Sequence, residues 1–178
     1  MKVNRFRLHA LLLFIGGLVW VIVGTRLALS PPGNPALDIY RDSKGSMPLL
    51  SGGMLFITSG MVIFYRELFL HKGLAKFAFI LIQSGSVLYF IGHSLRQFLN
   101  GAWEPAAPVG FIMLIIGLFL FGLRSIKVKS LPDPISYFIL ISSLCLLFFN
   151  DQFFTAWMSV PFGLIWIAIG GALFFKPL

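Results

Sequence analysis

Long runs of hydrophobic residues alternate along the chain with short polar segments. Six of these runs approach the ~20 residues with which an α-helix crosses a ~30 Å hydrocarbon core. The runs lie at about residues 8–29, 47–65, 75–99, 107–123, 134–150 and 156–175. The segments between them contain helix-breaking prolines, as in PPGNP at 31–35 and LPDP at 131–134. The pattern therefore predicts six transmembrane helices, of which the fifth is shortened by the polar residues Asn150, Asp151 and Gln152.

The composition supports a membrane environment. Hydrophobic residues make up 58% of the 178 residues, charged residues make up 11%, and the mean hydropathy is +0.92. Soluble domains contain about a quarter charged residues, and a monomer of 19.8 kDa could not bury this much apolar surface. We therefore expect an all-α, polytopic membrane protein with a single six-helix domain, residues 1–178.

Basic residues are distributed unevenly over the segments between the hydrophobic runs. If the N-terminus is cytoplasmic, the inside segments contain ten Lys and Arg against two acidic residues, whereas the outside segments contain four of each. Because such an asymmetry sets orientation, both termini are expected in the cytoplasm. The net charge of +8 is then explained by topology and by attraction to anionic lipid, and nucleic acid is not expected as a partner.

Glycines recur at a spacing of seven within the hydrophobic runs. The pairs are Gly17 and Gly24, Gly53 and Gly60, Gly85 and Gly92, Gly110 and Gly117, and Gly163 and Gly170, and the fifth run keeps the spacing with Ser143 and Asn150. Seven residues make almost two helical turns, so each pair lies on one stripe, where small residues let neighbouring backbones approach closely. The simplest architecture is three consecutive helical hairpins of a repeated unit. The alternative is coincidence, since eighteen glycines in apolar helices produce some matching spacings.

The fourth and sixth runs are the most similar pair, with PVGFIMLIIG at 108–117 and PFGLIWIAIG at 161–170. The chain resembles the HdeD-like acid-resistance membrane proteins in four features. These are six short spans, both ends inside, repeated glycines in each hairpin, and little chain outside the membrane. The resemblance covers the whole chain. It implies a multi-pass protein of the bacterial inner (plasma) membrane that is connected with envelope stress, and it supplies no established active site.

Residues that bind metals are few and scattered. His9 and His71 are expected on the inner side of the membrane, whereas His93 is expected near the outer side, and Cys145 lies within a hydrophobic run. A zinc or haem site needs several ligands that converge on one centre. The sequence therefore predicts no metal site and no cofactor.

Polar residues gather near the end of the third hydrophobic run. At the helical rise, His93 lies about 25 Å from Lys76. The same count brings Arg26, Arg96 and Asp151 to a similar height at the outer interface, and Glu104 is a candidate charge partner there. The candidate polar cluster therefore contains Arg26, His93, Arg96, Glu104 and Asp151. These side chains either pair their charges in a structural network or bind an anionic headgroup, a carboxylate substrate or a loop of a partner.

A second group of polar residues lies deeper in the third run. Gln83 is the deepest strongly polar side chain, and Ser86 and Tyr89 follow it. These three residues either line a pore or hydrogen-bond the helices to one another.

Three functions remain open from the sequence. The first is a non-enzymatic membrane protein, with an envelope-stress or accessory role, that acts through its helix faces and the outer polar cluster. The second is a channel or transporter for small solutes, with a polar path past Gln83. The third is an integral membrane enzyme that uses His93 as a general base; no catalytic residue is otherwise expected. The expected partner is the lipid bilayer, with another membrane protein or a second copy of the chain as further candidates.

Overall fold

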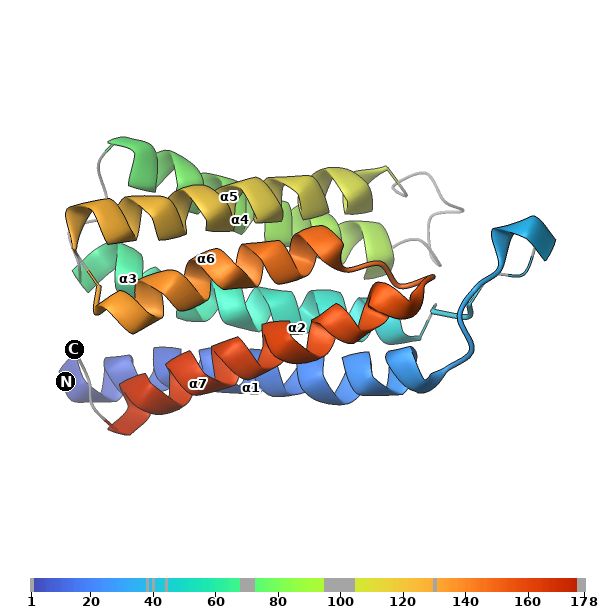
Figure 1. The fold of residues 1–178 in the computed structure, drawn as a ribbon. Coiled ribbons are helices and arrows are strands. Elements are labelled where there is room, and N and C mark those ends of the chain that lie inside the picture. Colours follow the sequence, from blue (N-terminus) through green and yellow to red (C-terminus); the bar gives the residue numbers. More distant parts are fainter. Residues whose placement is uncertain are drawn as a thin grey trace.

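The computed structural model describes residues 2–37, 39, 41–43, 45–67, 73–94, 105–129 and 131–175. The protein is all-α, and its long helices run side by side (Figure 1). The long helices are α1 (Lys2–Leu29), α2 (Ser46–Gly60), α4 (Gly73–Ser94), α5 (Ala106–Val128), α6 (Asp133–Phe148) and α7 (Ser159–Phe175). The short ones are α3 (Val62–Glu67) and the 3₁₀ helices η1 (Pro35–Leu37) and η2 (Phe154–Met158).

Prolines mark the beginnings of four of these helices. Pro48, Pro108, Pro134 and Pro161 lie in the first turns of α2, α5, α6 and α7. Proline is tolerated there because the first amide groups of a helix have no partner within the helix. The same residues that interrupt the hydrophobic pattern therefore start the next helix.

Each predicted run contains a helix, although α1 and α5 extend beyond the predicted bounds, and residues 95–99 of the third run lie outside the described residues. Two runs differ in more than their bounds. The second run forms α2 and α3, which are separated by a turn at Met61. The fifth run ends as a helix at Phe148, two residues before its predicted end. Phe149 is extended, and the side-chain oxygen of Asn150 accepts a hydrogen bond of 2.9 Å from the amide of Gln152. This local turn competes with continuation of the helix.

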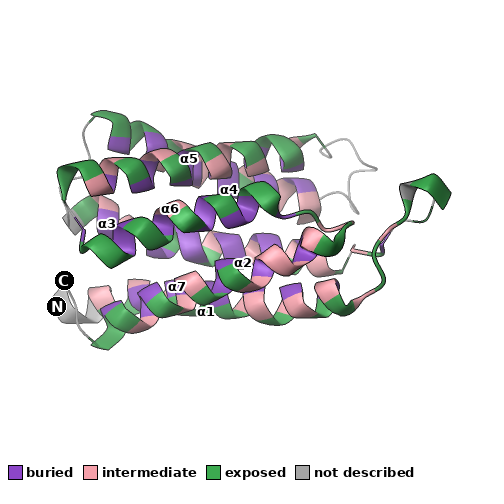
Figure 2. Ribbon diagram, viewed as in Figure 1, coloured by how far each residue is buried: buried purple, intermediate pink, exposed green. Residues whose placement is uncertain are grey.

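Within the described residues, five helical segments are long and apolar enough to cross a membrane. They are Phe6–Leu29, Ser46–Arg66, Gly73–Ser94, Ala106–Val128 and Phe154–Phe175, and α6 is apolar but shorter. Many large apolar residues are exposed, such as Ile22, Ile112 and Leu147. Exposed positions occur along all the long helices of the bundle (Figure 2). Soluble monomers rarely expose large continuous apolar patches. By helix length and hydropathy, the chain is a multi-pass membrane protein.

The two termini lie at the same end of the bundle (Figure 1). We call the opposite end the distal end. There α1, α4 and α6 finish, and α2, α5 and α7 begin. The distal end also holds η1 and the connection from Phe149 to Met158. This arrangement brings segments that are more than a hundred residues apart in sequence to one site.

Glycines mediate the two most extensive helix contacts, α4 with α5 and α1 with α7. A Cβ atom at Gly110 would lie 2.6 Å from the carbonyl oxygen of Gly85 on α4. A Cβ atom at Gly17 would lie 2.6 Å from the carbonyl oxygen of Gly163 on α7. The spacing of seven thus coincides with real backbone contacts. However, the glycines of α7 face α1 rather than α6, so the triplicated hairpin stays a prediction.

Candidate functional site

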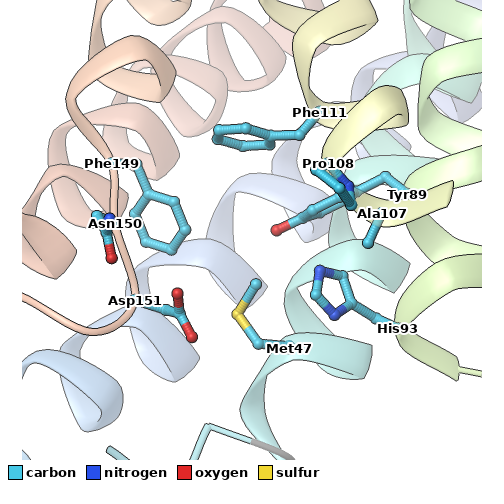
Figure 3. A pocket seen from close by; sticks show the side chains of 9 residues that line it. All are labelled: Met47, Tyr89, His93, Ala107, Pro108, Phe111, Phe149, Asn150 and Asp151. Atoms are coloured by element: carbon cyan, nitrogen blue, oxygen red, sulfur yellow. The ribbon is translucent and has the colours of Figure 1, made fainter. Parts of the chain in front are cut away.

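A pocket of about 270 Å³ opens at the distal end, between α4, α5 and the segment that follows α6 (Figure 3). We call it the distal pocket. Its lining residues are Met47, Tyr89, His93, Ala107, Pro108, Phe111, Phe149, Asn150 and Asp151. The volume lies just below the roughly 300–1,000 Å³ of typical small-molecule sites. The pocket therefore suits a small molecule or the headgroup of a larger one.

Aromatic rings form much of its wall. Tyr89 and His93 are four residues apart on α4, hence on one face of that helix. Their rings meet edge to face, with centroids 4.7 Å apart. Phe111 of α5 lies against Tyr89 with centroids 5.4 Å apart, and against Phe149 at 6.1 Å. The pocket thus lies beside a row of rings that joins α4, α5 and the end of α6.

The hydroxyl group of Tyr89 is the most unusual polar group of the site. The residue is 2% exposed, and among the described residues its hydroxyl has no hydrogen-bond partner. Figure 3 shows this hydroxyl directed into the pocket. A buried hydroxyl without a partner costs about 1–3 kcal/mol, and most such groups in native proteins are satisfied. Tyr89 therefore points a free hydrogen-bonding group at the place where a ligand would sit.

Asp151 places a carboxylate at the edge of the pocket (Figure 3). Its Oδ2 atom accepts hydrogen bonds of 2.7 Å from the hydroxyl of Ser43 and 2.8 Å from the side-chain amide of Gln152. Both donors converge on Oδ2, so Oδ1 has no donor among the described residues. The carboxylate is thus held in place through Oδ2.

Arg41 fixes the loop that carries Ser43 to the segment that carries Asp151. Its side chain is 7% exposed, its Nε donates to the carbonyl oxygen of Pro31, and its Nη1 donates to that of Asp151, each at 3.0 Å. Its main-chain amide donates to Oε1 of Gln152 at 2.8 Å. Burial lowers the pKa of the Arg41 guanidinium, and the nearby charge of Asp151 opposes this shift.

Sequence reasoning counted Arg41 among the outer basic residues but did not select it as a site residue. The residues next to Arg41 in the sequence do not indicate its role, because its hydrogen-bond partners Asp151 and Gln152 lie 110 and 111 residues away. Arg41 holds the two segments together only because the fold brings the loop after α1 next to the segment after α6.

The predicted outer polar cluster is divided by the structure. His93 and Asp151 both line the distal pocket. Arg26 lies exposed in the last turn of α1 and is not among the pocket-lining residues. Arg96 and Glu104 lie outside the described residues.

The structure also places the three deeper polar candidates, Gln83, Ser86 and Tyr89, in two different environments. The side-chain amide of Gln83 donates to the carbonyl oxygen of Thr58 at 2.7 Å, and the hydroxyl of Thr58 donates to that of Ser86 at 3.0 Å. Ser86 is fully buried and in turn donates to the carbonyl oxygen of Gln83 at 2.8 Å. Gln83 and Ser86 therefore connect α4 to α2, whereas Tyr89, one turn further along, belongs to the distal pocket.

The described residues contain no group of three or more His, Cys, Asp or Glu side chains that could hold a metal ion. In the distal pocket, a carboxylate, an imidazole and a phenol face a largely apolar wall. This combination can bind a polar group by hydrogen bonds and shield it between rings. Comparisons of the chain with protein-family models, with curated proteins and with solved structures find no match.

Proposed function

We propose that this chain is a non-enzymatic multi-pass membrane protein that binds a small ligand, or the headgroup of a membrane molecule, in the distal pocket. The observation that carries this proposal is the buried hydroxyl of Tyr89, which faces the pocket without a partner among the described residues. The rigidly held carboxylate of Asp151 adds a second polar contact at the same place.

The bonding of the intramembrane polar groups supports binding rather than conduction. Gln83, Thr58 and Ser86 are bonded to one another between α2 and α4. Ser142 and Ser125 donate to carbonyl oxygens of their own helices, at 2.7 and 2.8 Å. Hydroxyl and amide groups bonded in this way stabilise a bundle but offer little to a passing solute.

For the cellular setting, we propose the bacterial inner membrane, with both termini in the cytoplasm and the distal pocket at the outer surface. The basic residues Arg7, Arg66, Arg124 and Lys127 belong to the end of the bundle that carries the termini, as the preference of Lys and Arg for the cytoplasmic side requires. The proposed role is an accessory or envelope-stress function, as in the HdeD-like proteins that the sequence resembles.

Purification in mild detergent followed by native mass spectrometry tests the binding function. We expect the wild-type chain to retain a small molecule or lipid that Asp151→Ala loses. Asp133→Ala is the matched control, because Asp133 is exposed at the opposite end of α6. Solute flux in proteoliposomes that Gln83→Leu abolishes would instead show a transporter.

A further inference from the structure

We infer that the distal pocket recognises an ammonium group, carried either by a lipid headgroup of the ethanolamine type or by a free small amine. This inference rests on the proposed function, because it names the ligand class of the same pocket. It follows from the charge, the rings and the unpartnered hydroxyl that line the pocket.

The charge of the lining favours a cation. Among the described residues that line the pocket, Asp151 alone carries a carboxylate, and its Oδ1 has no donor among the described residues. Arg41 directs its Nε and Nη1 atoms to the carbonyl oxygens of Pro31 and Asp151 and is not among the described residues that line the pocket. A ligand anion would face the carboxylate directly, whereas an ammonium group would pair with it.

The rings select an organic cation over a metal ion. Metal sites for hard cations need several oxygen ligands, and the described lining residues supply a single carboxylate among Tyr89, Phe111 and Phe149. Aromatic faces attract ammonium groups by about 0.5–2 kcal/mol, more where water is excluded. One carboxylate with several rings is therefore suited to an alkylammonium ion.

The hydroxyl of Tyr89 indicates which kind of ammonium group fits best. Its oxygen can accept a hydrogen bond, as can Oδ1 of Asp151. A primary ammonium carries three N–H donors and satisfies both acceptors, whereas a quaternary ammonium carries none. The pocket is thus expected to prefer an ethanolamine headgroup to a choline headgroup.

The test uses the purified full-length chain and defined amines. Thermal unfolding in detergent is followed with ethanolamine hydrochloride, choline chloride and sodium chloride at equal ionic strength. In parallel, nanodiscs contain phosphatidylglycerol mixed with either phosphatidylethanolamine or phosphatidylcholine, and native mass spectrometry identifies the retained lipid. A bound ligand raises the unfolding temperature in proportion to its occupancy. We expect ethanolamine to stabilise more than choline if the source is free amine, and phosphatidylethanolamine to be retained preferentially if it is lipid.

Two pocket variants and two matched controls identify the site. Tyr89→Phe removes a hydroxyl that has no described partner, so it is expected to fold like the wild type. Asp151→Asn removes the charge. We expect Asp151→Asn to weaken ammonium binding about tenfold or more, and Tyr89→Phe to weaken it severalfold. The exposed residues Asp133 and Tyr137 of α6 provide the controls Asp133→Asn and Tyr137→Phe, which are expected to bind like the wild type.

The outcomes separate the two proposals. Equal stabilisation by ethanolamine and sodium chloride, without preference between the lipids, would overturn the ammonium inference. So would binding that both pocket variants leave unchanged. If the wild type retains a different molecule that Tyr89→Phe loses, the ammonium inference fails and the binding function stands. If the retained molecules are the same in the wild type and in both pocket variants, both proposals fail.

Discussion

Arg41 shows at the scale of one residue how the distal end is held. A buried cation is costly unless its donors are bonded, and Arg41 meets this requirement with two carbonyl oxygens from different segments of the chain. The planar guanidinium suits this task because its Nε and Nη1 donors are fixed relative to one another. A lysine has one flexible ammonium and cannot reproduce that geometry.

We therefore expect Arg41→Lys to lower the free energy of unfolding by about 1–3 kcal/mol, because one of the two carbonyl contacts is lost. Thermal unfolding in detergent measures the change, and limited proteolysis of residues 30–45 reports whether the loop has loosened. Arg26→Lys is the control, because Arg26 is exposed. Equal stability of Arg41→Lys and the wild type would show that the two carbonyl contacts contribute nothing.

Residue identity also limits how much of the site can be read from the sequence. His93 and Asp151 could be selected because both are polar residues at the ends of hydrophobic runs. For Tyr89 the sequence leaves open whether it lines a pore or hydrogen-bonds helices to one another, since nothing in its neighbours tells whether a tyrosine in a helix faces a pocket or another helix. Phe111 and Phe149 carried no signal, because aromatic residues in apolar runs are usual and only the contact between α5 and the end of α6 gives them a role.

At the scale of the elements, the glycine contacts determine how closely the helices approach. A Cβ atom at Gly110 would lie 2.6 Å from the carbonyl oxygen of Gly85, whereas a Cβ atom at Gly171 of α7 meets nothing within 4 Å. Backbone atoms cannot move aside as the end of a flexible side chain can, so the helices themselves must separate.

Gly110→Ala is accordingly expected to destabilise the bundle by about 1–3 kcal/mol. Gly171→Ala is expected to be neutral or slightly stabilising, because alanine favours the helix and has free space there. Denaturant titration in detergent micelles measures both. A neutral Gly110→Ala would mean that α4 and α5 are less closely packed than described.

Gln83 provides a test of the contact between α4 and α2, because its side chain on α4 donates a hydrogen bond to the carbonyl oxygen of Thr58 on α2. Interhelical hydrogen bonds of this kind contribute about 0.6 kcal/mol on average in membranes. We expect Gln83→Leu to cost about that much in thermal stability and to leave ligand binding at the distal pocket unchanged. A larger loss of binding than in Asp151→Asn would place the site near Gln83 instead.

Helix positions were well predicted from the sequence, since hydrophobic length and proline breaks both depend on local composition. Helix pairing was predicted only in part. Short connections suggest that successive helices pack together, and this holds for α1 with α2, α4 with α5 and α5 with α6. The contact of α1 with α7 depends instead on matching glycine faces, Gly17 against Gly163, which lie at opposite ends of the sequence. Repeat spacing shows that a glycine face exists but does not identify the helix that covers it.

At the scale of the whole molecule, the proposed orientation can be tested with single cysteines. The background is Cys145→Ser, which removes the one native cysteine. We expect Leu37→Cys, in η1 at the distal end, to react with a membrane-impermeant maleimide in intact cells. Lys127→Cys, at the other end of α5, is expected to react only after permeabilisation. The reverse labelling pattern would contradict the cytoplasmic placement of the termini.

The contact between α1 and α7 also has a consequence for biosynthesis. Among the described helices α1 is synthesised before the others, whereas α7, which covers its Gly17 and Gly24 face, is synthesised after them. Until then this face of α1 is open to lipid or to an insertion chaperone, and the bundle cannot close. Any chain that stops before residue 159 therefore leaves the glycine face uncovered, which gives membrane quality control a feature that separates chains without α7 from chains that contain it.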